Sequence, residues 1–270
     1  MTRVRVMTAT DLHQSRWMYQ ALEKAVHEHK PDVLALVGDF LDSGLPHPEL
    51  FSPEECASHL AALRCEVVFI RGNHEGDNWY PFVNRWLELK KPLHNPHGEP
   101  VVFGPLVILV FPSTFAHEEP FLMGRRNNTF EFEKWIPDAL KRYGPAARTL
   151  WLFHEPPAGT CICDQEGPLA GVDEWRMAIE FYQPFVTISG HDHETPVFDG
   201  SWHDVVGQTL CVNVGQPVRL NKAKQILHYC LIDFEFAAAK PALPLQTTVT
   251  AFPWTEALVL PDNGNLKFDL

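Results

Sequence analysis

Basic residues are scarce in this chain. Its 270 residues include 22 Lys and Arg against 34 Asp and Glu, so the formal net charge is −12 with the 14 histidines counted as neutral. No long stretch rich in Lys and Arg occurs in the sequence. Because proteins bind long nucleic acids largely through positive charge, this composition predicts no long nucleic-acid partner and disfavours a nuclease.

Long apolar runs are also missing. The most apolar stretch, residues 101–111, is interrupted by Gly104 and Pro105 and is much shorter than the roughly 20 residues that a membrane-spanning helix requires. Arg3 and Arg5 near the beginning of the sequence are not followed by the apolar run of a signal peptide. We therefore predict a cytoplasmic location and no membrane partner.

Cysteines are few and include no CxxC pair. A chain of this length can bury a stable hydrophobic core without disulfide bonds, so we expect no disulfide framework. Cys161 and Cys163 form the only close pair, on a predicted loop. Two loop thiols are the simpler interpretation, and a role in redox chemistry or soft-metal binding is left open.

Short strands alternate with helices through most of the chain. The apolar periodicity predicts helices over residues 16–29, 53–63, 80–89, 130–142 and 172–182, and strands over 4–9, 33–37, 67–70, 101–103, 106–111, 149–153, 185–189, 210–214 and 226–234. This rhythm is typical of the α/β (α+β) class, and we expect two facing mixed β-sheets flanked by α-helices. We expect one domain over residues 1–240, with 241–270 as an extended C-terminal segment packed on it.

Polar side chains follow five of the predicted strands at the point where each strand ends. Ligands bind outside the carboxyl ends of strands in α/β sheets, so these side chains should meet at one rim. The residues are Asp11, His13, Asp39, Asn73, His74, His154, His191 and His193.

The chemistry of this group is that of a metal centre. Imidazole nitrogens and carboxylate oxygens without thiolates suit Mn²⁺, Fe, Zn²⁺ or Co²⁺. Asp11 and His13 are two residues apart, so in an extended segment both side chains leave the same face. Seven or eight ligands exceed the needs of one ion, and two divalent metal ions bridged by one carboxylate account for the number better.

Five ordered motifs resemble those of the calcineurin-like metallophosphoesterases over residues 4–217. They are Asp11-Leu12-His13, Gly38-Asp39, Gly72-Asn73-His74-Glu75, His154 and Gly190-His191-Asp192-His193. The segments 154–160, 182–184 and 190–194 are more narrowly similar to the Icc-related phosphoesterases, a group associated with cyclic-nucleotide phosphodiesterase activity. The fold that the resemblance implies agrees with the two facing sheets expected above.

The resemblance also implies roles for individual residues. Asp11, His13, Asp39 and His193 would hold the first metal ion. Asp39 would bridge to a second ion, completed by Asn73, His154 and His191. His74 matches a catalytic histidine beside the scissile phosphate, so Asn73 and His74 would both contact substrate. Asp42 matches an aspartate that pairs with this histidine in related phosphatases, and a loop aspartate held by local backbone is the alternative.

Two departures from the family pattern concern the substrate side of the site. Ser43 stands where protein phosphatases have an arginine, which removes a phosphate clamp. Residues 213–217 match an Asn-Pro-Gly-Ser-like turn of relatives only imperfectly.

The predicted function is hydrolysis of a small phosphate ester with a dinuclear metal centre. We expect loops 113–128 and 160–171 to roof the site, with His117, Glu118 and Glu119 either facing substrate or simply solvated. An acidic roof repels a dianionic monoester more than a monoanionic diester, which favours a phosphodiesterase of the cyclic-nucleotide type. The alternatives are a phosphomonoesterase or protein phosphatase and, less favoured, a nuclease or a non-catalytic scaffold. The oligomeric state is left open.

Overall fold

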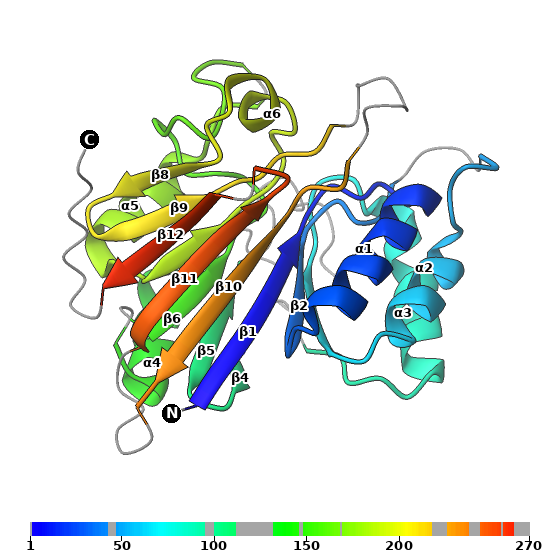
Figure 1. The fold of residues 1–270 in the computed structure, drawn as a ribbon, viewed down its shortest axis with the longest axis horizontal. Helices are drawn as coiled ribbons and strands as arrows, with labels where there is room; N and C mark the ends of the chain where they lie inside the picture. The colour runs from blue at the N-terminus through cyan, green and yellow to red at the C-terminus, as the bar shows by residue number, and fades with distance from the viewer. Residues whose placement is uncertain are drawn as a thin grey trace.

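The fold consists of two six-stranded β-sheets with helices on their outer faces (Figure 1). The computed structural model describes residues 2–42, 47–94, 100–111, 132–145, 148–167, 169–217, 226–237, 244–254 and 256–261, and the strand counts refer to these residues. Predicted loop 113–128, with His117, Glu118 and Glu119, lies outside them, and so does Ser43.

The first sheet has the strand order β12-β11-β10-β1-β2-β3. Its parallel half comprises β1 (Thr2–Ala9), β2 (Val33–Val37) and β3 (Glu66–Ile70), joined through α1 (Arg16–His29) and α2 (Pro53–Ala61). Its antiparallel half comprises β10 (Tyr229–Phe236), β11 (Pro244–Phe252) and β12 (Glu256–Pro261). The central strand β2 is buried along its whole length, as expected for a parallel strand covered on both faces.

The second sheet has the order β4-β5-β6-β7-β9-β8. Strands β5 (Leu106–Val110), β6 (Thr149–Leu152), β7 (Val186–Ile188) and β9 (Thr209–Val212) are parallel. Strands β4 (Val101–Phe103) and β8 (His203–Val206) close the two edges in antiparallel pairing.

Three apolar cores hold these layers together. Alternate residues of the strands fill the space between the sheets, where Val6 and Ile232 of the first sheet share one cluster with Leu150 of the second. The opposite face of the first sheet packs on α1, α2 and α3 (Trp79–Glu88), which follows the short helix η1 (Gly76–Asn78). The second sheet packs on α4 (Phe132–Tyr143) and α5 (Asp173–Tyr182). The expected fold, two facing mixed sheets flanked by helices, is confirmed.

The sequence did not predict every element. Strand β8 and the short helix α6 (Thr195–Asp199) were missed, because the edge strand β8 begins with His203 and Asp204 and carries no apolar run, and α6 spans little more than one helical turn. Within the described part of the C-terminal segment, residues 244–261 form β11 and β12, which extend the first sheet beyond β10. Pro244 is the first residue of β11 and Pro261 the last of β12, so neither removes an N–H from the middle of a ladder. The division at residue 240 stays a prediction.

Candidate metal centre

The carboxyl ends of strands from both sheets meet at one rim. The imidazole Nδ1 of His154, which follows β6 in the second sheet, lies 2.9 Å from the carbonyl of Val37 at the end of β2 in the first. The backbone N–H of His191, which follows β7, lies 3.2 Å from Asp11 Oδ1, which follows β1. The predicted ligands, far apart in the sequence, are thereby brought together at the junction of the two sheets.

Two groups of predicted ligands have donor atoms within 4.8 Å of one another. One group is Asp11, His13, Asp39 and His193, and the other is Asp39, His154 and His191. The Oδ1 atom of Asn73 lies 3.0 Å from His154 Nε2 and 3.0 Å from His191 Nδ1, so Asn73 joins the second group. Asp39 is common to both, which is where the resemblance implies a bridging carboxylate. The ligand roles themselves stay predictions.

The backbone at this rim is turned sharply. Asp11, His13, Asp39 and His191 have φ values of 54°, 44°, 49° and 65°, in the left-handed region that residues other than glycine rarely adopt. Such conformations persist only where surrounding structure enforces them, and they gather at functional sites. These four ligands therefore come from tight turns, and Asp11 and His13 do not lie in the extended segment that their spacing suggested.

The second donor group fits a divalent cation. When the His154 ring is neutral and Nδ1 donates to the Val37 carbonyl, Nε2 carries the lone pair, and this atom lies 3.2 Å from Asp39 Oδ2. Electron-rich atoms thus converge, and they repel unless a positive charge lies among them. Although burial opposes it, the carboxylate of Asp39 holds the pKa of His154 well above its ordinary value. Without an ion, a proton on Nε2 supplies this charge, and a divalent ion bound here would take its place.

Gly72 leaves room among these ligands. A Cβ at this position would lie 2.2 Å from Asp39 Oδ1 and 2.6 Å from His154 Nε2. Only glycine therefore permits the loop after β3 to pass this close to the second donor group.

The first donor group has the same character. His13 Nε2 lies 3.3 Å from His193 Nε2, and His193 Nε2 lies 3.3 Å from Asp11 Oδ1. Burial lowers the pKa of His13, which favours the neutral imidazole that binds metals. The Thr10 hydroxyl donates to Asp11 Oδ2 at 2.8 Å and orients this carboxylate from behind, as outer partners of metal ligands do.

His74 and Asp42 lie beside the first group. His74 Nδ1 is 3.4 Å from Asp42 Oδ1, and the hydrogen bond to Asp42 raises the pKa of His74. The backbone of Asp42 is also held locally, because its N–H donates to Gln14 Oε1 at 2.9 Å and its carbonyl accepts from Asn78 Nδ2. Both features that the sequence left as alternatives are present, the local backbone support and a carboxylate facing His74.

Glu75 was quoted in the motif without a role. It is fully buried, and its two carboxylate oxygens accept from the N–H of Gly72 at 2.6 Å and of Leu41 at 3.3 Å. Burial, reinforced by the charge of Asp39, raises the pKa of Glu75 to about 8. Glu75 ties the loop after β2 to the loop after β3. The sequence contained one signal that could have identified Glu75. It is an acidic residue within the motif Gly72-Asn73-His74-Glu75 that is not a predicted metal ligand.

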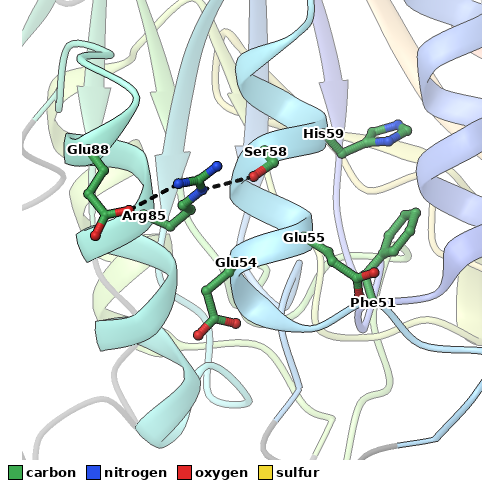
Figure 2. A pocket seen from close by; sticks show the side chains of 7 residues that line it. All are labelled: Phe51, Glu54, Glu55, Ser58, His59, Arg85 and Glu88. Atoms are coloured by element: carbon green, nitrogen blue, oxygen red, sulfur yellow. Dashed lines mark hydrogen bonds and ion pairs between the residues drawn. The ribbon is translucent and has the colours of Figure 1, made fainter.

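A surface hollow between α2 and α3 is separate from this centre (Figure 2). Arg85 on α3 bonds to Ser58 on α2 at 3.1 Å and to Glu88 at 3.0 Å. No predicted ligand lines the hollow. The remaining lining residues are Phe51, Glu54, Glu55 and His59.

The thiols of Cys161 and Cys163 lie in different surroundings. Cys161 is exposed, with its Sγ 3.3 Å from the His203 carbonyl, whereas Cys163 is buried beside Thr160. Burial raises the pKa of both thiols, which keeps them protonated and weakly nucleophilic.

Comparisons with known proteins identify the family. The family model described as calcineurin-like phosphoesterase matches residues 4–195. The chain belongs to this family of metallophosphoesterases and is a hydrolase of phosphoric ester bonds. No curated protein sequence matches it significantly.

Solved structures with the same fold share little sequence with this chain. A dimetal phosphatase from Danio rerio is 13% identical with a TM-score of 0.59, covering 96% of this chain and 99% of the other. A protein from Thermus thermophilus is 11% identical with a TM-score of 0.58 and the same coverage. A protein described as the anchor in the inner membrane complex of Plasmodium is 9% identical with a TM-score of 0.50, covering 97% and 89%. These similarities establish the fold.

Among the described residues, we find no helix with both the length and the apolar character needed to cross a membrane.

Proposed function

We propose that this phosphoesterase hydrolyses a small phosphodiester, of the cyclic-nucleotide type, using two divalent metal ions. The observation that carries the proposal is the position of Asp39, shared between two groups of nitrogen and oxygen donors. The diester preference rests on the resemblance of segments 154–160, 182–184 and 190–194 to the Icc-related phosphoesterases, a group associated with cyclic-nucleotide phosphodiesterase activity. Mn²⁺ and Fe suit the donor set best, and Zn²⁺ or Co²⁺ is compatible with it.

The first ion would be held by Asp11, His13, Asp39 and His193, and the second by Asp39, Asn73, His154 and His191. Two divalent ions in this arrangement supply Lewis acidity toward the phosphoryl oxygens and a water molecule of lowered pKa. Asn73 is an exposed residue of the rim, so its amide is available to the phosphoryl group as well.

His74 is the proposed general acid. Its side chain is 44% exposed beside the first donor group, and Asp42 faces its Nδ1, so Nε2 is the nitrogen that would deliver a proton to the leaving oxygen. Asp42 fixes the orientation and tautomer of this ring.

A metal-reconstituted substrate panel tests the proposal. It compares p-nitrophenyl phosphate, bis-p-nitrophenyl phosphate, and the 3′,5′- and 2′,3′-cyclic nucleotides. We expect turnover of the diesters to exceed that of the monoester. Turnover of the monoester alone would overturn the diesterase assignment and favour a phosphomonoesterase.

A non-catalytic scaffold is tested separately by metal content. Every ligand position is filled by a residue able to bind a metal ion, so we expect about two Mn²⁺ per chain after reconstitution. Less than one ion per chain would favour the scaffold.

A further inference from the structure

The turn over residues 213–216 lies in one of the two segments that depart from the family pattern, and its side chains are buried. Asn213 and Gln216 are 0% and 1% exposed. Buried amides are retained only where their donors and acceptors find partners, so these partners indicate what the turn does.

Gln216 joins the two sides of the first donor group. Its backbone N–H donates to the carbonyl of His193 at 3.1 Å, and its side-chain Nε2 donates to the carbonyl of Thr10 at 3.1 Å. Thr10 directly precedes Asp11. Gln216 therefore contacts the backbone next to Asp11 and the backbone of His193, which are both predicted ligands of the first ion. These ligands come from the loop after β1 of the first sheet and from the loop after β7 of the second.

The Gln216 amide is itself fixed by the residue that precedes β10. Nε2 also donates to the carbonyl of His228 at 2.8 Å, and Oε1 accepts from the His228 N–H at 3.2 Å. The Nδ1 atom of His228 lies 2.9 Å from the carbonyl of Val214, so His228 also contacts the backbone of the turn. The amide therefore has one orientation, with Oε1 toward the His228 N–H and Nε2 toward Thr10.

Asn213 contacts the loop after β7, which carries His191 and His193. Its Nδ2 lies 3.3 Å from the carbonyl of Gly190 and 3.0 Å from that of Asp192, the residues on either side of His191. Its Oδ1 accepts from the N–H of Gly215 at 2.9 Å. Gly215 has φ +55°, and a Cβ there would lie 2.5 Å from the His193 carbonyl, so this turn reaches the ligand loop only with glycine at 215.

We propose that Asn213 and Gln216 are positioning residues of the metal centre, with Gln216 setting the place of Asp11 relative to His193. The inference rests on the proposed dinuclear centre. Substitution of the Gln216 side chain frees the backbone beside Asp11 and leaves His154 and Asn73 untouched. Substitution of Asn213 frees the backbone on both sides of His191. Loss of Gln216 therefore weakens the first ion selectively, whereas loss of Asn213 weakens both.

The test is a Mn²⁺ titration of the full chain, read by calorimetry and by the electron paramagnetic resonance signal of the coupled ion pair. In Gln216→Met, which keeps the length of the side chain, we expect one dissociation constant to rise by about 10–100-fold and the other to change less than about twofold. Gln216→Leu removes both donors without burying a charge beside two carbonyls, so it gives the same result if the Met variant does not fold.

Gln183→Met is the matched control. Its amide also makes three contacts, to the carbonyls of Ile179 and Glu180 and to the N–H of Gln208, at the end of β7 opposite the ligands. We expect a lower unfolding temperature with both dissociation constants unchanged. Gln216→Met added to His193→Ala should not weaken the remaining ion further.

The outcomes separate the two proposals. If the unsubstituted chain binds fewer than two ions, the proposed function fails. If it binds two ions, and Gln216→Met keeps both dissociation constants while losing only thermal stability, the positioning role is overturned.

Discussion

Replacing His74 by alanine separates chemistry from metal binding. The side chain is 44% exposed, so its loss removes little buried surface. Its contact with Asp42 at 3.4 Å is a partly exposed pair, of the kind worth about 0–1 kcal/mol to folding. The fold and both ions should therefore be retained.

The effect on catalysis should be much larger. A positioned general acid contributes about 10²–10⁴ in rate, which corresponds to about 2.7–5.4 kcal/mol of activation free energy. The loss should depend on the leaving group, because p-nitrophenolate leaves without a proton whereas a nucleoside alkoxide requires one. For a cyclic nucleotide we expect kcat to fall by about 100-fold or more, and for bis-p-nitrophenyl phosphate by less than about tenfold.

Steady-state kinetics on both substrates, with metal analysis of the same preparations, provides the measurement. His27→Ala is the control, since His27 is an exposed histidine of α1 outside the site. Turnover of the cyclic nucleotide at the unsubstituted rate, with both ions bound, would refute the assignment of His74 as the general acid.

Three further predictions concern the metal centre and the stability of the fold. Asp39→Asn should weaken both ions and Asp11→Asn only one, measured by metal titration; equal effects would contradict a shared role for Asp39. Chelation should lower the unfolding temperature, because each ion held only by the folded chain stabilises it by about 2.7 kcal/mol at a free concentration about 100 times its Kd; an unchanged temperature in calorimetry would contradict this. Asp233 accepts two bonds from Arg5, at 2.8 and 2.9 Å, and although burial opposes it, the arginines lower the pKa of Asp233. This stabilisation is present at neutral pH and is lost as the pH falls through the lowered pKa, below the ordinary value of 3.8. Asp233→Asn should therefore lower the free energy of unfolding by up to about 1 kcal/mol at pH 7, with the difference disappearing in acid; a difference that persists in acid denaturation curves would contradict it.

Regular elements and the gathering of polar residues could be predicted because each has a local signal. The helix over residues 16–29 and the strand over residues 33–37 were predicted with their observed bounds. The position of each polar residue directly after a strand was sufficient to predict that Asp39, His154 and His191 converge, without knowledge of which sheet each belongs to.

The supports of these residues could not be predicted, because they depend on contacts distant in sequence. Gln216 bonds to Thr10 across 206 positions, and Asn213 reaches Ile162 across 51. The positive φ of Asp11 and of Asp39 is likewise enforced by packing between loops, since no local preference favours aspartate there strongly enough. The contact between Glu75 and Leu41 also joins two loops that only the sheet brings together.

The most direct test is a crystal structure of the Mn²⁺-reconstituted protein with diffraction data collected at the manganese absorption edge. The account predicts two anomalous peaks about 3.5–4 Å apart, with Asp39 between them. Asp11, His13 and His193 should surround one peak, and Asn73, His154 and His191 the other. A single peak, or two peaks that do not share Asp39, would contradict the dinuclear centre.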